Sequence, residues 1–270
     1  MDRTYSIRRP SLAFIAGAIV GVIGGLIGLG GAEFRLPILI TVFALYPHRA
    51  VRFNLLVSFV TLAFAAVTRL KIQQIDFTAY ADVVLSMITG GIVTAWIGAG
   101  LLARVPAGRL VAIIAALLLV VAVMLFVEAT FTGSAFPTLP HQPLVRAGVG
   151  LFAGLFVGAI SSLLGVAGGE FIIPILIFIF GADIKTAGTL SLLISLPVVA
   201  VGVAKHRMTG HYRSLDVLTY LVLPMSAGSV IGSVFGGFLS SATPTNALKI
   251  FLAVILATSA LKLWRHGERG

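Results

Sequence analysis

Cysteine is missing from this 270-residue chain, and charged residues are scarce. Without cysteine there is no disulfide, no iron–sulfur cluster and no thiolate nucleophile. Only 10% of the residues are charged, against about 25% in an ordinary soluble domain, whereas 59% are hydrophobic and the mean hydropathy is +1.09. Apolar runs of membrane-spanning length follow one another from Ser11 almost to Trp264, which leaves no stretch for a sizeable soluble domain. The sequence therefore predicts an all-α integral membrane protein.

The motifs of several functional classes are also missing. The chain has no P-loop, no nucleophile elbow and no H-E-x-x-H motif, so ATP-driven pumping and intramembrane proteolysis have no support and no enzyme is expected. The histidines lie in loops or at segment ends without a partner at metal-ligand spacing, so we expect no metal and no cofactor. The net charge of +10 comes from basic residues in short loops, which are signals of topology and not of nucleic-acid binding.

An internal duplication organises the chain. At an offset of 137 residues, 14 of the 25 residues from Ala16 to Ile40 are identical to their partners from Ala153 to Ile177. We place the first repeat at 1–127, a Pro/Thr/Ser/Gly-rich linker at 128–145 and the second repeat at 146–270, all within one membrane domain. Duplication inside the membrane is typical of secondary transporters, whose substrate sites lie where the repeats meet.

Each repeat holds about four or five apolar segments, eight to ten in total. The second segment, about 34 to 46, is too short to span comfortably and is either a tilted half-span or the returning arm of a hairpin. If all five segments cross, the halves are inverted, whereas they are parallel if the first two together cross once. The basic residues favour inversion slightly and place both termini in the cytoplasm, in what we expect to be a bacterial inner membrane.

Two glycine-rich stretches interrupt the apolar segments, GLIGLGGAEFRLP at 25–37 and SLLGVAGGEFIIP at 162–174. We predict that Gly30, Gly31, Gly168 and Gly169 break the helices and that the two breaks meet near mid-membrane. The helices then restart with free N–H groups and positive dipole ends directed at the breaks, which would form an anion site. The structural alternative is close helix packing, which better suits another set of glycines. That set is Gly17, Gly21, Gly24, Gly154 and Gly158.

The ionisable residues of these stretches have open roles. Glu33 and Glu170 are the acids furthest from any loop, and each either carries protons for coupling or caps its own helix. Arg35 has Ile172 as its counterpart in the second repeat, so it is not duplicated. It either binds a substrate anion, neutralises Glu170 across the repeat interface, or extends to a membrane surface.

Four polar residues complete the candidate substrate site. Asn54 and Ser58 form an i, i+4 pair on one face of the third segment, and Ser191 and Ser195 form the corresponding pair in the second repeat. Their side chains would donate to a bound oxyanion. The alternative is hydrogen bonding between helices, which is common for Ser and Asn in membranes.

The motifs GLGGAEFRLP and GVAGGEFIIP, in two copies over essentially the whole chain, resemble those of the TauE/SafE family, also called the toluenesulfonate uptake permease family. The resemblance implies a secondary transporter that exports sulfite, sulfonates or related oxyanions with proton or ion coupling. The alternative is an anion channel, or a permease for another small anion or metabolite. The expected partners are a small anionic substrate and the lipid bilayer, with no nucleic acid and with a homodimer left open.

Overall fold

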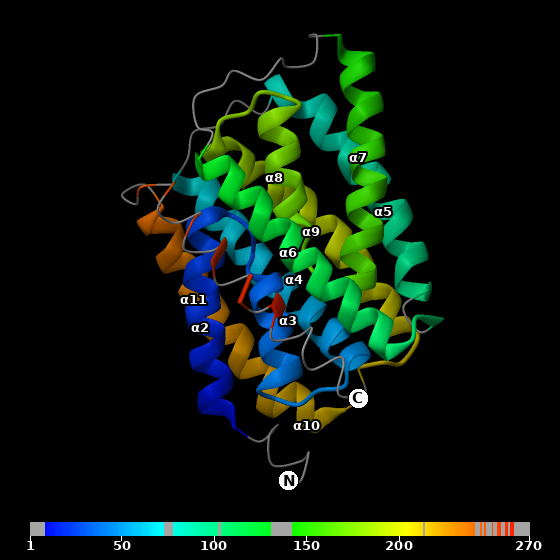
Figure 1. Ribbon diagram of the computed structural model, residues 1–270, viewed down its shortest axis with the longest axis vertical. Coiled ribbons are helices and arrows are strands. Elements are labelled where there is room, and N and C mark those ends of the chain that lie inside the picture. The colour runs from blue at the N-terminus through cyan, green and yellow to red at the C-terminus, as the bar shows by residue number, and fades with distance from the viewer. Residues whose placement is uncertain are drawn as a thin grey trace.

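The computed structural model describes residues 9–72, 78–101, 104–130, 142–212 and 214–240, with scattered residues between 244 and 261. Most of the predicted linker, both chain ends and much of the last apolar segment lie outside these residues. The described elements are all helical (Figure 1). They are α2 (Pro10–Ile27), α3 (Ala32–Thr41), α4 (Pro47–Ile72), η1 (Thr78–Tyr80), α5 (Ala81–Leu101), α6 (Ala107–Thr130), α7 (Pro143–Leu164), α8 (Gly169–Phe178), α9 (Ile184–Met208), α10 (Leu215–Val217), η3 (Leu218–Val222) and α11 (Leu223–Leu239).

Six stretches of the described helices are long and apolar enough to cross a membrane: Pro10–Ile27, Pro47–Ile72, Thr78–Gly100, Pro143–Leu164, Lys185–Met208 and Leu215–Leu239. Large apolar side chains such as Phe152 and Leu85 remain exposed on their outer faces, where lipid replaces water. The prediction of an all-α, multi-pass membrane protein is confirmed.

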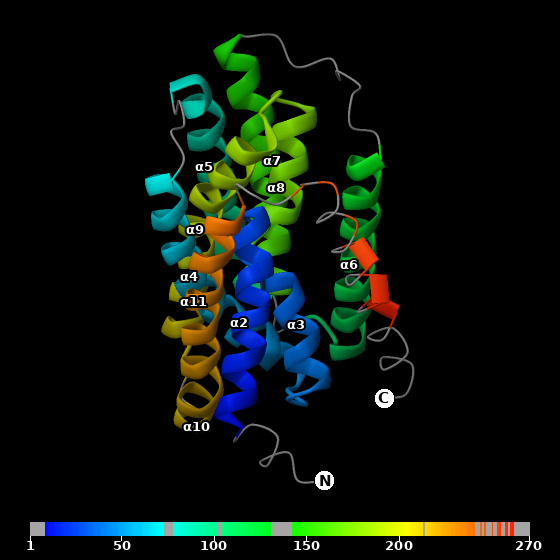
Figure 2. The same ribbon diagram turned by 90° about the vertical axis from the view of Figure 1, so that its left-hand side faces the viewer.

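Two short helices turn back into hairpins instead of crossing. In Figures 1 and 2, α3 returns from the end of α2 toward the lower end, where α2 begins, and α8 returns from α7 toward the upper end, where α7 begins. Both short helices have ten residues, so the second segment is the returning arm of a hairpin. The hairpins enter from opposite ends and α4 runs opposite to α9, so these elements are inverted. The premise of five crossing segments was wrong, since the second segment of each half returns instead of crossing. The duplication itself rests on the sequence identities.

Glycines bring helices of different halves into close contact. Gly17, Gly21 and Gly25 of α2 lie against the backbone of Met225, Ser229 and Ser233 in α11. On the other side of the bundle, Gly154 and Gly158 of α7 lie against Met87 and Gly91 of α5. Small residues at such crossings let helix backbones approach closely in a membrane. The packing interpretation therefore holds for Gly17, Gly21, Gly154 and Gly158, whereas Gly24 packs on Gly30 and Gly31 inside its own hairpin.

Replacing one of these glycines tests the packing. In Gly154→Ala the new Cβ would lie 2.7 Å from the Cα of Met87, so the helices must separate, and we expect a loss of about 1–3 kcal/mol of stability. Gly148→Ala, on the same helix, meets nothing within 4 Å and should leave stability unchanged or slightly raised. Thermal unfolding of the purified variants in detergent provides the measurement. Equal midpoints for the two variants would contradict this account of the α5–α7 contact.

Candidate functional site

The two helix breaks depend on glycines in left-handed backbone geometry. Gly28 ends α2 with a φ of 92°, and Gly165 ends α7 with a φ of 65°. Gly30, Gly31 and Gly168 also have positive φ, between 75° and 82°, which residues with a Cβ adopt at a cost. Gly169 is different: it is the first residue of α8, and its φ is not positive. The predicted breaks are therefore confirmed, with Gly30, Gly31 and Gly168 outside the helices and Gly169 at the start of the helix that follows the break.

The breaks of the two hairpins touch each other inside the protein. A Cβ on Gly169 would lie 3.4 Å from the Cα of Leu29, and one on Gly30 would lie 3.9 Å from the Cβ of Ala167. The predicted approach of the stretches 28–35 and 165–172 is confirmed. In Figure 2 they meet near the middle of the long axis. Neither α3 nor α8 has a side-chain cap at its N-terminus, so the positive ends of two buried helices converge here.

Reciprocal hydrogen bonds join each hairpin to the other half. Asn54 in α4 donates from Nδ2 to the carbonyl of Gly165, where α7 ends, at 2.7 Å, and to that of Ala32 at 2.7 Å. Its counterpart Ser191 in α9 donates from Oγ to the carbonyl of Gly28, where α2 ends, at 2.8 Å. These donors satisfy carbonyls that the broken helices leave free. In this structure Asn54 and Ser191 therefore make bonds between helices, and neither presents a free donor to an anion.

Arg35 is fully buried and directs every guanidinium N–H at a neutral oxygen. Nε donates to Asn54 Oδ1 at 3.3 Å, and Nη2 donates to Ser58 Oγ at 2.8 Å and to the Gly30 carbonyl at 3.1 Å. Nη1 donates to Thr61 Oγ1 and Ser229 Oγ, both at 3.1 Å. Arg35 forms no ion pair with a described carboxylate, so it neither neutralises Glu170 by direct contact nor reaches a surface. Its positive charge is solvated but not balanced by contact.

The corresponding positions of the second half lack the arginine. Ile172 stands where Arg35 does in the first half, and Val198 takes the position of Thr61. Ser195, the counterpart of Ser58, is buried, and its hydroxyl has no hydrogen-bond partner among the described residues. The two hairpins therefore differ in charge, because only the first carries a guanidinium at its break, whereas the polar groups buried at the second are Ser161, Ser162 and Glu170.

The two glutamates are buried without hydrogen-bond partners. Both oxygens of Glu33 and both of Glu170 lack a partner among the described residues, and the two side chains are 0% and 2% exposed. Each carboxyl group nevertheless lies in the first turn of its helix and interacts electrostatically with the backbone N–H of its own residue, so both roles considered for the glutamates stay open. Glu33 interacts electrostatically with Glu170 and with Arg35, which places the three groups in one electrostatic cluster. Such carboxyl groups inside a membrane usually bind a proton, an ion or a substrate.

Three residues in and around the site were not predicted from the sequence. Thr61 lies one turn beyond Ser58 on the same face of α4, so its helical spacing was an available signal. Ser229 comes from α11, and no local pattern connects it with Arg35. Arg69 was assigned to a loop, yet it is buried and donates from Nη2 to the carbonyls of Gly25 and Leu26 at 3.0 and 2.9 Å. It thus satisfies the C-terminal carbonyls of α2.

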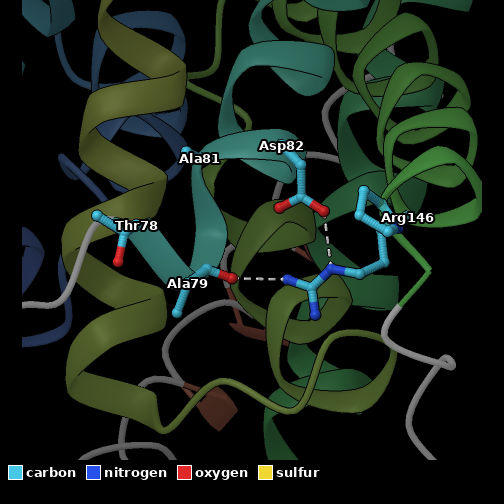
Figure 3. Close-up of a pocket in the computed structure, with 6 residues that line it drawn as sticks. Thr78, Ala79, Ala81, Asp82 and Arg146 are labelled. Carbon is cyan, nitrogen blue, oxygen red and sulfur yellow. Dashed lines mark hydrogen bonds and ion pairs between the residues drawn. The ribbon is translucent and has the colours of Figure 1, made fainter.

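A pocket of about 400 Å³ lies apart from this cluster, between the starts of α5 and α7 (Figure 3). Arg146 donates from Nε to Asp82 at 2.9 Å and from Nη2 to the Ala79 carbonyl at 2.9 Å. The guanidinium is neutralised by its own carboxylate partner. This ion pair ties α5 to α7, and we assign it a structural role.

The reciprocal bonds lead to a matched test on one helix. Ser191→Ala would leave the Gly28 carbonyl without its donor, and we expect a loss of about 1–3 kcal/mol of stability. Ser195→Ala removes a buried hydroxyl that has no partner, so it should have little effect or stabilise slightly. Thermal unfolding in detergent compares the two. A Ser195→Ala variant that lost more stability than Ser191→Ala would refute the assignment of these bonds.

Comparisons with known proteins agree with this architecture. The profile of the family described as "Sulfite exporter TauE/SafE" matches residues 13–263. The probable membrane transporter protein YunE of Bacillus subtilis is 23% identical over 270 residues, which cover 94% of this chain and 96% of that protein. The probable membrane transporter protein YjnA of the same organism is 24% identical over 263 residues, covering 92% and 97%. No solved structure matches the chain significantly. With paired hairpins and a family match over nearly its whole length, this chain belongs to the TauE/SafE family of membrane transporters.

Proposed function

We propose that this protein is a secondary transporter of small sulfur-containing oxyanions and that they bind where the two hairpins meet. The observation that carries the proposal is the buried guanidinium of Arg35, whose five hydrogen bonds all go to neutral oxygens. A buried charge without a direct counter-ion is costly, so an anion that reaches it gains both charge neutralisation and a planar donor fork. The neutral hydroxyl groups are partners that an anion would displace or join.

Helix geometry supports an anion in the same place. The N-termini of α3 and α8 lack side-chain caps and face the breaks, which adds two positive dipole ends to the guanidinium. Other secondary transporters use broken helices in this manner to hold anionic groups at mid-membrane. Pyramidal and tetrahedral oxyanions fit such a set of donors, because their oxygens accept from several directions.

The sulfur chemistry and the direction come from the family's description, which names sulfite and export. The sequence identities of 23% and 24% concern proteins described only as probable membrane transporters, so they support the transporter class and not the cargo. Sulfite and organic sulfonates share the charged oxygen face that Arg35 would recognise. An anion channel is the competing function: it would pass current without saturation, whereas a transporter saturates and shows counterflow.

The charge distribution supports cytoplasmic termini in a bacterial inner membrane. More basic residues lie at the end of the molecule where α2 begins than at the opposite end, and such an excess faces the cytoplasm. The first group is Arg9, Arg49, Arg52, Arg104, Arg109, Lys205 and Arg207, and the second is Arg69, Lys71, Arg146 and Lys185.

Substitutions of Arg35 test the anion site. Arg35→Gln removes the charge, and we expect the half-saturating concentration for sulfite or a sulfonate to rise by about 30-fold or more. Arg35→Lys keeps the charge but loses the planar set of donors, so its half-saturating concentration should lie between those of wild type and Arg35→Gln. Counterflow in proteoliposomes measures the affinity, with Gly148→Ala as the control for handling. Wild-type affinity in a folded Arg35→Gln protein would place the anion elsewhere.

Substitutions of the glutamates test proton coupling. Glu33→Gln and Glu170→Gln keep the shape of each side chain but remove one titratable group, so the pH profile of flux should change in each variant. A purely structural glutamate would alter thermal stability and leave that profile in place. Flux measured across a range of pH in wild type and both variants gives the answer. Three superimposable normalised profiles would end the coupling hypothesis.

A further inference from the structure

The cluster at the hairpin breaks contains one fixed positive charge and two carboxyl groups. Arg35 carries the positive charge at any physiological pH, whereas Glu33 and Glu170 are each either ionised or protonated. All three side chains are buried inside a membrane-embedded bundle. A net charge in such an interior is strongly unfavourable, so the protonation of the glutamates must follow the charge of whatever else is bound.

The other elements around the cluster add no further titratable group to this balance. The described interiors of α2, α7, α8, α9 and α11 contribute no charged side chain besides Glu170, and their nearby polar groups are serine hydroxyls. These are Ser161, Ser162, Ser191, Ser195 and Ser229. From α4, Arg69 is buried in the last turn and directs its guanidinium at the C-terminal carbonyls of α2. That charge is engaged by the negative end of a helix, so we count it apart from the cluster.

The net charge of the site can then be compared with and without bound substrate. Without substrate, Arg35 is neutralised when one glutamate is ionised and the other is protonated. When a singly charged anion arrives, neutrality is restored if the ionised glutamate takes up one proton, since the anion now balances Arg35. A doubly charged anion would leave one negative charge that no side chain of the cluster balances, because both glutamates are already protonated; only the partial positive charges at the starts of α3 and α8 would offset it.

We infer that Arg35, Glu33 and Glu170 form a charge-counting site that selects singly charged oxyanions and binds each of them together with one proton. The inference rests on the proposed function and narrows its substrate class to monoanions, such as monosulfonates and hydrogensulfite. The unpartnered oxygens of both glutamates are its geometric support, because a buried carboxyl group without a hydrogen bond is poorly accommodated unless it gains a proton or a ligand. Transport is then electroneutral, and its direction follows the sum of the anion and proton gradients.

The experiment uses wild-type protein in proteoliposomes with a pH-sensitive dye inside and the membrane potential clamped by potassium and valinomycin. The probes are ethanesulfonate, with one fixed negative charge, and 1,2-ethanedisulfonate and sulfate, each with two. We expect ethanesulfonate to enter with about one proton per anion and with a rate that changes less than about twofold between 0 and −100 mV. Both dianions should move at least tenfold more slowly.

A double variant sharpens the test. Either glutamate alone still supplies a proton site, so Glu33→Gln and Glu170→Gln should each keep one proton per anion. The double variant, with both replacements, has none, and its ethanesulfonate flux should carry no protons and respond to the clamped potential. The number of protons per anion in wild type is measured separately, so the inference can be tested even if the double variant does not fold.

The outcomes separate this inference from the proposed function. Dianions that move as fast as ethanesulfonate, anion flux without protons in wild type, or a strict need for sodium would overturn charge counting and leave anion transport intact. If neither these probes nor sulfite and thiosulfate move, the proposed function itself fails.

Discussion

A broken helix inside a membrane leaves backbone carbonyls and N–H groups without partners, and this constraint shapes the centre of the molecule. Water is not available there, so protein groups must satisfy them. Asn54 and Ser191 bind the carbonyls at the ends of α7 and α2, and Arg69 binds two more on α2. The third helix of each half therefore holds the first helix of the other half. The N-termini of α3 and α8 have no side-chain cap, so their free N–H groups could donate to a bound anion.

The two halves share this frame but differ in chemistry. The motifs differ at Arg35 against Ile172, so only the first hairpin carries a guanidinium at its break. Ser58 accepts a hydrogen bond from Arg35, whereas the corresponding Ser195 has no partner among the described residues. Glu33 and Glu170, by contrast, are retained in both motifs. A symmetric scaffold thus carries an asymmetric site, which is compatible with a substrate that has one charged face.

The sequence predicted the helical class, the positions of the breaks and the short returning helices, because glycine, proline and apolar periodicity act locally. It also pointed to Arg35, Asn54 and Ser58 as neighbours of one site. It did not predict that Asn54 and Ser191 would bind backbone carbonyls of the opposite hairpin, since that requires knowing which helices cross. Ser229 was missed for the same reason: its contact with Arg35 spans 194 residues. Arg69 was missed because a cation at a helix end resembles a loop residue.

The pairing of α2 with α11 and of α5 with α7 has a consequence for how the chain assembles in time. Among the described helices α2 is synthesised first and α11, which covers its glycines, is synthesised last, so the small-residue face of α2 stays open while the helices between them are made. The α5–α7 contact is complete much earlier, as soon as the second half begins. The end of α2 can be held earlier, because Arg69 of α4 and Ser191 of α9 bind carbonyls there. A chain that stops before α11 would therefore leave the glycine face of α2 uncovered while the end of that helix is already bound.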